Sequence, residues 1–165
     1  MCIRDRPIVR RFIEDAGNTT QALGVGRVVG QIYAFLYFSE SPRGLDDLKE
    51  TLGISKGSAS MGVRQLEQWG AVQRVWVKGD RKDYYTANDY FGSIIRNILS
   101  DIMGKRLAAL GQSLEVADAE LNGGDTPSDA GSNHQFLRDR VNRLKTFQMK
   151  VEKTWNNPIV KLVLK

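Results

Sequence analysis

The residues best suited to binding chemistry lie at positions 53–69, in the sequence GISKGSASMGVRQLEQW. At about 100° per residue, Ala59, Val63 and Leu66 share one face of a helix. The opposite face is polar, small near its start and almost free of carboxylates, with Gly57, Ser60, Met61, Arg64, Gln65 and Gln68. Such side chains can hydrogen-bond to phosphates and base edges. Taken alone, the pattern fits a helix that enters a DNA groove and an ordinary solvated helix equally well.

The helix must begin and end near these residues. Ser55 is a good N-cap, because its hydroxyl can accept a hydrogen bond from a backbone N–H of the first turn. Gly53 suits the tight turn that separates this helix from the one before it. We therefore predict a helix over 55–69 that ends at Gly70.

A basic hairpin is predicted next, in the sequence AVQRVWVKGDRKDYYTA. Strand-forming residues flank the turn sequence Lys78-Gly79-Asp80, which predicts a β-hairpin over 72–86. Its tip bears Lys78, Arg81 and Lys82. From Ser55 to Lys82, six basic residues face two acidic ones: Lys56, Arg64, Arg74, Lys78, Arg81 and Lys82 against Glu67 and Asp80. A solvated hairpin tip would explain the charge alone, whereas the order helix, turn, helix, basic hairpin is that of a wing.

Enzymatic and metal chemistry find little support in the composition. The chain of 165 residues has one cysteine, Cys2, and one histidine, His134, so neither a disulfide nor a zinc set is available within it. No carboxylate pair lies in an apolar run, and we expect no catalytic residues, no metal and no cofactor. The net charge of +5 leans modestly towards nucleic acid.

The start of the chain bears on where the protein acts. No apolar run reaches membrane-spanning length and no secretory segment opens the chain, which favours a cytoplasmic protein. The opening MCIRDR looks like translated sequencing adapter, so residues 1–6 are expected to be a non-native leader.

Helices are predicted on the N-terminal side of the candidate site. Residues 7–16 form one that stops at Gly17, before a polar break at 18–20. The apolar stripe of 24–39 predicts a buried helix, and 45–52 a short one after a loop at 39–44. Gly24, Gly26 and Gly30 lack the preceding strand of a dinucleotide-binding loop, which favours close helix packing instead.

Long helices are predicted after the hairpin. Residues 90–121 form one of roughly 48 Å, with a heptad-like apolar stripe that includes Ile102, Met103, Leu107, Leu110, Leu114 and Leu121. Residues 122–133 are predicted as a linker. A last helix over 136–151 folds back against the long one, while the residues after Pro158 fit a short helix or a strand. The stripe is covered either by a second copy of the chain or by the helix around Val141 and Leu144.

Three motifs resemble one family of regulators: GRVVGQIYAFLYFSESPRGLDDL, GISKGSASMGVRQLEQWGAVQRVW and KGDRKDYYTA. Over residues 24–87 the chain resembles the MarR-type winged-helix transcription regulators, and within them the branch named for GbsR, the regulator of glycine betaine synthesis from choline. The resemblance implies a mainly α fold with a small β-hairpin wing, a winged helix-turn-helix domain flanked by N- and C-terminal dimerisation helices.

Residue roles follow from this resemblance. It implies that the recognition helix contacts the major groove through Ser55, Lys56, Gly57, Ser58, Ser60, Met61, Arg64 and Gln65. It implies that the wing contacts the minor groove through Lys78, Arg81 and Lys82, with Asp80 bracing Arg81. The expected parts are 7–23 as N-terminal helix and linker, 24–89 as the DNA-binding domain and 90–165 as the dimerisation arm.

The resulting hypothesis is a homodimeric regulator, more plausibly a repressor, that binds a near-palindromic operator in double-stranded DNA. A winged helix that binds protein within a larger assembly is the alternative, but Arg64, Gln65 and Gln68 favour nucleic acid. If the ligand chemistry also follows the family, Tyr33, Tyr37, Tyr90 and Phe91 would form an aromatic cage for a quaternary ammonium effector such as choline. These four rings could equally fill core and surface-edge positions.

Overall fold

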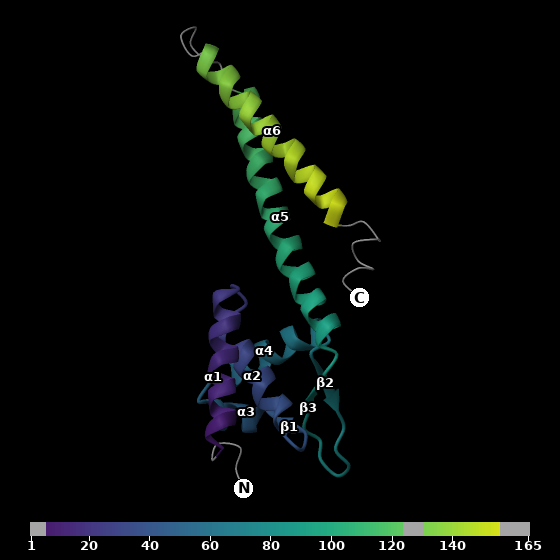
Figure 1. The fold of residues 1–165 in the computed structure, drawn as a ribbon. Helices are drawn as coiled ribbons and strands as arrows, with labels where there is room; N and C mark the ends of the chain where they lie inside the picture. Colours follow the sequence, from purple (N-terminus) through teal and green to yellow (C-terminus); the bar gives the residue numbers. More distant parts are fainter. Residues whose placement is uncertain (1–5, 124–130, 156–165) are drawn as a thin grey trace. The chain divides into compact units, whose positions relative to one another are not determined.

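The computed structural model describes residues 6–123 and 131–155 (Figure 1). The chain divides into two compact units, residues 1–95 and 96–165. The first contains α1 (Pro7–Ala22), α2 (Arg27–Tyr37), β1 (Arg43–Gly44), α3 (Leu45–Leu52), α4 (Lys56–Gln68), β2 (Val72–Val75) and β3 (Tyr84–Ala87). The helix α5 (Phe91–Gly123) begins in the first unit, and its remainder forms the second with α6 (Gly131–Trp155). Of the predicted leader at 1–6, the structure describes Arg6 alone, and the residues after Pro158 lie outside the described residues.

The first helix is longer than the sequence pattern predicts. Gly17 does not end α1, and the expected polar break at 18–20 is helical up to Ala22. The hydroxyl of Thr20 donates to the carbonyl oxygen of Ala16 at 3.0 Å, so this polar side chain is satisfied within the helix. Gly17 instead serves the contact with α2, because a Cβ there would lie 2.8 Å from Cγ of Gln31.

Gly30 allows the two N-terminal helices to pack closely. A Cβ at this position would lie 2.2 Å from the carbonyl oxygen of Ala16 and 2.4 Å from Oγ1 of Thr20. The prediction that this glycine serves helix packing, and not a dinucleotide loop, is therefore confirmed. Together Gly17 and Gly30 bring α1 against the helix that supports the candidate site.

The core of the first unit forms where α2, α3 and α4 meet. Ile32 and Leu48 are completely buried, and Val63 is 1% exposed. Gly62 faces α2, since a Cβ there would lie 2.6 Å from Cδ1 of Ile32. Because α4 contributes Val63 and Gly62 to this core, one of its faces is buried and the other is left free for binding.

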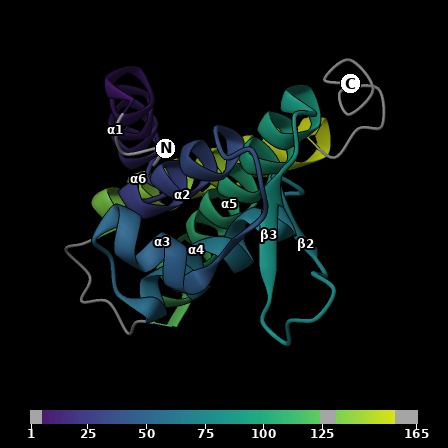
Figure 2. The same ribbon diagram turned by 90° about the horizontal axis from the view of Figure 1, so that it is seen from below.

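A three-stranded antiparallel sheet completes the unit, in the order β1-β3-β2. The hairpin of β2 and β3 was predicted, whereas β1 was predicted as part of a loop at 39–44. Its two residues pair with Tyr84 and Tyr85 of β3, so this strand exists only through a partner distant in sequence. Both ribbon views show the hairpin reaching beyond the neighbouring helices of this unit (Figure 2). The fold is a helix-turn-helix followed by a wing, as predicted.

In the second unit, α6 runs back along α5, and polar side chains join the two helices. Lys145 Nζ lies 2.6 Å from Asp118 Oδ2, and Arg138 donates to the carbonyl oxygen of Leu121 at 3.1 Å. The only side chain of this unit that is buried among the described residues is Leu114. The predicted linker at 122–133 is partly wrong, because α5 extends to Gly123 and α6 begins at Gly131; residues 124–130 lie outside the described part.

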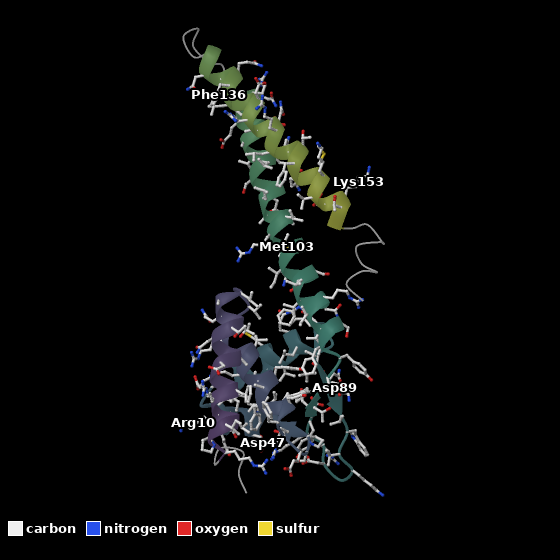
Figure 3. All side chains as sticks on the ribbon, viewed as in Figure 1. Arg10, Asp47, Asp89, Met103, Phe136 and Lys153 are labelled. Atoms are coloured by element: carbon white, nitrogen blue, oxygen red, sulfur yellow. The ribbon has the colours of Figure 1, made fainter. Side chains whose placement is uncertain are left out.

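Several large apolar side chains of α6 are exposed. They include Phe136, which Figure 3 labels near the start of this helix. The exposed set is Phe136, Leu137, Leu144, Phe147 and Met149, at 53%, 45%, 51%, 61% and 58% exposure. Among the described residues, no helix is long and apolar enough to cross a membrane.

Candidate nucleic-acid interface

The start of α4 is fixed by the serine that the sequence predicts as its cap. The backbone N–H of Ser58 donates to Oγ of Ser55 at 3.0 Å, and the two hydroxyls lie 2.9 Å apart. Because this cap satisfies one of the free N–H groups at the helix start, it holds the first turn in place. The adjacent Lys56 and Gly57 are exposed at this end of the helix.

The two faces of α4 divide as predicted. Ala59, Val63 and Leu66 are buried, as is Trp69 just after the helix. The outer side chains are exposed at Met61 and Arg64 and partly exposed at Ser58, Ser60 and Gln65. Met61 is 74% exposed, so an apolar side chain lies in the middle of this polar surface. An exposed apolar side chain such as this methionine can contact the methyl group of a thymine.

The wing is held by a network around its turn. The backbone N–H of Asp80 donates to the carbonyl oxygen of Val77 at 3.1 Å. Gly79 has φ of +91°, a left-handed conformation that favours glycine at the third position of a turn. The hydroxyl of Tyr84 donates to Oδ2 of Asp80 at 2.7 Å, and the amide of Lys82 donates to its Oδ1 at 3.0 Å.

Asp80 braces the wing mainly through Tyr84 and Lys82. The carboxylate accepts from the Tyr84 hydroxyl and the Lys82 backbone, and more weakly from the backbone of Arg81, the partner that the resemblance implies. The hydrogen bond from Tyr84, followed by that from Lys82, holds the pKa of Asp80 below its usual range. The Asp80 carboxylate thus stabilises the conformation of the turn.

Asp46 connects the recognition helix to the wing, and sequence reasoning missed it. Its Oδ1 lies 3.4 Å from Nζ of Lys56 on α4, and its Oδ2 lies 3.4 Å from Nζ of Lys82 in the wing. The charge of Lys56 is the main cause that lowers the pKa of Asp46, followed by the hydrogen bond from Lys82. No spacing rule could identify this residue, because the two lysines come from elements 26 positions apart in the chain.

These groups border an open groove of about 310 Å³. Its cationic lining comes from α4 and the wing, through Lys56, Arg81 and Lys82. Its acidic and neutral lining is Gly44, Leu45, Asp46, Asp47, Asp83 and Tyr84. The structure therefore brings residues from the recognition helix and the wing to one surface, while Lys78 lies in the exposed turn of the wing.

Three of the four aromatic residues proposed for an effector contact one another: Tyr33, Tyr37 and Phe91. Tyr33 and Tyr37 stack with centroids 6.0 Å apart, and Tyr37 meets Phe91 edge-on at 5.5 Å. The hydroxyl of Tyr33 donates to the carbonyl oxygen of Asn88 at 2.8 Å. Burial, with the nearby Tyr37 and Asp89, raises the pKa of Tyr33 to about 12. Tyr90 is 73% exposed, and the cage stays a prediction.

The comparisons with known proteins agree with this geometry. No family model matches the chain. The HTH-type transcriptional repressor OpcR of Bacillus subtilis is 31% identical over 133 residues, which cover 78% of this chain and 72% of OpcR. The chain belongs to the GbsR-like branch of the MarR-type transcriptional regulators. This membership confirms the predicted family and the expectation that the chain is not an enzyme.

Other relatives of this GbsR-like chain match over shorter stretches. The HTH-type transcriptional repressor GbsR of B. subtilis is 28% identical over 109 residues, 66% of this chain and 60% of that repressor. YvaV of the same organism is 33% identical over 85 residues, 51% of this chain and 48% of YvaV. The chain thus spans about half to three-fifths of these two relatives. A solved transcriptional regulator shares the fold, with a TM-score of 0.52 at 22% identity over 90% of this chain and 98% of that one.

Proposed function

We propose that this GbsR-like chain is a transcriptional repressor that binds a near-palindromic operator as a homodimer. The polar face of α4 enters the major groove, and the wing contacts the adjacent minor groove. The observation that carries the proposal is the joint contact of Lys56 and Lys82 with Asp46, which brings cationic side chains of α4 and of the wing to one surface. Two relatives named as repressors, OpcR and GbsR, support repression over activation.

Selection of duplexes from a randomised library tests this proposal without knowledge of the operator. The purified chain is incubated with the library at low salt, and the bound duplexes are recovered, amplified and sequenced. We expect an enriched motif, referred to below as the selected duplex, whose affinity falls steeply with salt. Binding to a scrambled duplex serves as the reference for specificity.

Asp46→Asn should tighten binding to the scrambled duplex by a few-fold. The carboxylate forms exposed ion pairs with both lysines. DNA phosphates must displace this carboxylate before they can bind the lysines, and the substitution removes that competition. The lowered pKa keeps Asp46 ionised throughout the neutral range, so the effect should be constant from pH 6 to 8. Fluorescence anisotropy of labelled DNA measures the change.

Glu50→Gln is the matched control, because it removes one exposed carboxylate from the same helix. An equal gain in both variants would show that net charge alone matters and that the ion pairs of Asp46 do not compete with DNA.

Homodimerisation is proposed from the exposed apolar side chains of α6. Leu144 and Phe147 remain 51% and 61% exposed, so α5 of the same chain leaves much of both side chains uncovered. Large exposed apolar surface usually marks an interface. The stripe Ile102, Met103, Leu107, Leu110, Leu114 and Leu121 belongs to the same proposed interface, although Leu114 is already buried within one chain.

Phe147→Asp should convert the dimer to a monomer, because a charge would be buried at the interface without a partner. Light scattering at micromolar concentration measures the mass. Asn142→Asp adds the same charge at an exposed position about 140° around α6 and should leave the dimer intact. A wild-type chain that is monomeric, or two variants with equal masses, would contradict the proposed interface.

A further inference from the structure

The wing carries an exposed tryptophan, Trp76, which is not among the recognition-helix and wing-tip residues predicted to contact DNA. Trp76 follows β2 directly and is 80% exposed. An indole has a large apolar surface and an N–H donor, and both usually find partners where a tryptophan is functional. Trp69, the other tryptophan of this unit, is 5% exposed and belongs to the core.

One face of β2, the strand that leads to Trp76, is turned towards α4. Side chains alternate along a strand, so positions 72 and 74 share this face. Val72 is buried on this face, and Arg74 Nε lies 3.8 Å from Glu67 Oε1 at the end of α4. Trp76 lies two residues beyond Arg74, just past the end of β2 and towards the wing tip.

The charges around Trp76 suit a phosphate backbone. Lys78 and Arg81 are exposed in the turn that follows it. The two acidic residues of the hairpin have local partners: Asp80 accepts from Tyr84, and Asp83 Oδ1 lies 3.4 Å from Arg74 Nη1. The excess of exposed positive charge beside an apolar ring favours a polyanion as the occupant over an apolar or basic protein surface.

We infer that Trp76 is a DNA-contacting residue of the wing, whose indole packs against the deoxyribose of the backbone at the edge of the minor groove. In this position its N–H can donate to a neighbouring phosphate, and the ring limits how deeply the wing enters the groove. The inference deepens the proposed function and rests on it, since it assigns a further positioning residue to the same interface.

Tryptophan fluorescence tests the contact directly. In the Trp69→Phe/Trp155→Phe chain, Trp76 is the one remaining tryptophan. We expect the selected duplex to shift its emission and to reduce its quenching by acrylamide several-fold. Anisotropy of the labelled duplex in the same titration shows independently whether DNA is bound. If the anisotropy rises while emission and quenching stay constant, the inference is overturned and the proposed function stands. If the wild-type chain binds no duplex in a parallel titration, the proposed function fails.

A second variant guards against a folding defect in that chain. Trp76→Ala in the otherwise unchanged protein should fold normally, because the side chain is 80% exposed. We expect it to weaken binding to the selected duplex roughly tenfold, as truncation of an aromatic anchor does, with most of the affinity restored in Trp76→Phe. Equal affinity of wild type and Trp76→Ala would overturn the inference.

Discussion

Arg64→Ala should weaken binding to the selected duplex by roughly 1–3 kcal/mol. The side chain is exposed on the outer face of α4, directly after Val63, which is 1% exposed and anchors the helix. Its guanidinium can bind a guanine edge with two hydrogen bonds or hold a phosphate. The substitution leaves the core untouched, so the loss should appear in binding and not in stability.

The salt dependence separates these two roles. If Arg64 contacts a base, the preference at one position of the selected duplex should relax. If it contacts a phosphate, affinity for all duplexes should fall together and the slope of log K against log salt should flatten by about one unit. Arg106→Ala removes the same charge from an exposed position in the second unit and serves as the control. Unchanged affinity of Arg64→Ala for both selected and scrambled duplexes would exclude α4 from the groove.

Gly30→Ala should destabilise the protein by roughly 1–3 kcal/mol. Alanine ordinarily favours a helix over glycine, so the sign of this change depends on packing alone. Here the added Cβ would lie 2.2 Å from the carbonyl oxygen of Ala16, a backbone atom that cannot rotate away. Either α1 must move from α2, or the backbone must distort.

Urea unfolding followed by circular dichroism measures this loss. Gly92→Ala is the control within the same unit, since a Cβ there would meet nothing within 4 Å. It should change the free energy of unfolding by no more than about 0.5 kcal/mol. A Gly30→Ala variant as stable as the wild type would show that α1 and α2 pack less closely than described.

Local patterns in the sequence predicted the binding elements well. The faces of α4 follow from helical periodicity, and the Ser55 cap follows from a side chain that bonds three residues ahead. The hairpin follows from strand-forming residues around a turn with a glycine at φ +91°. Each of these features depends on neighbours in the chain, which a single sequence displays directly.

Features that depend on distant partners were missed. Gly17 looks like a helix stop, but its role is to admit Gln31 of the next helix. The strand β1 has two residues and exists through its pairing with β3. For α6, the sequence left open whether its apolar residues cover α5, and it did not predict the bonds that Lys145 and Arg138 make to that helix. Composition alone cannot show which face of a helix its neighbour covers.

The selection experiment tests the central claim most directly, namely that α4 and the wing of a dimer bind duplex DNA together. We predict enrichment of two inverted half-sites whose centres lie about 10–10.5 base pairs apart, the spacing of one helical turn. In a footprinting experiment on the selected duplex, the protein should protect a major groove in each half-site and the adjacent minor groove. If low-salt selection enriches no sequence and the chain retains no duplex, the account is contradicted.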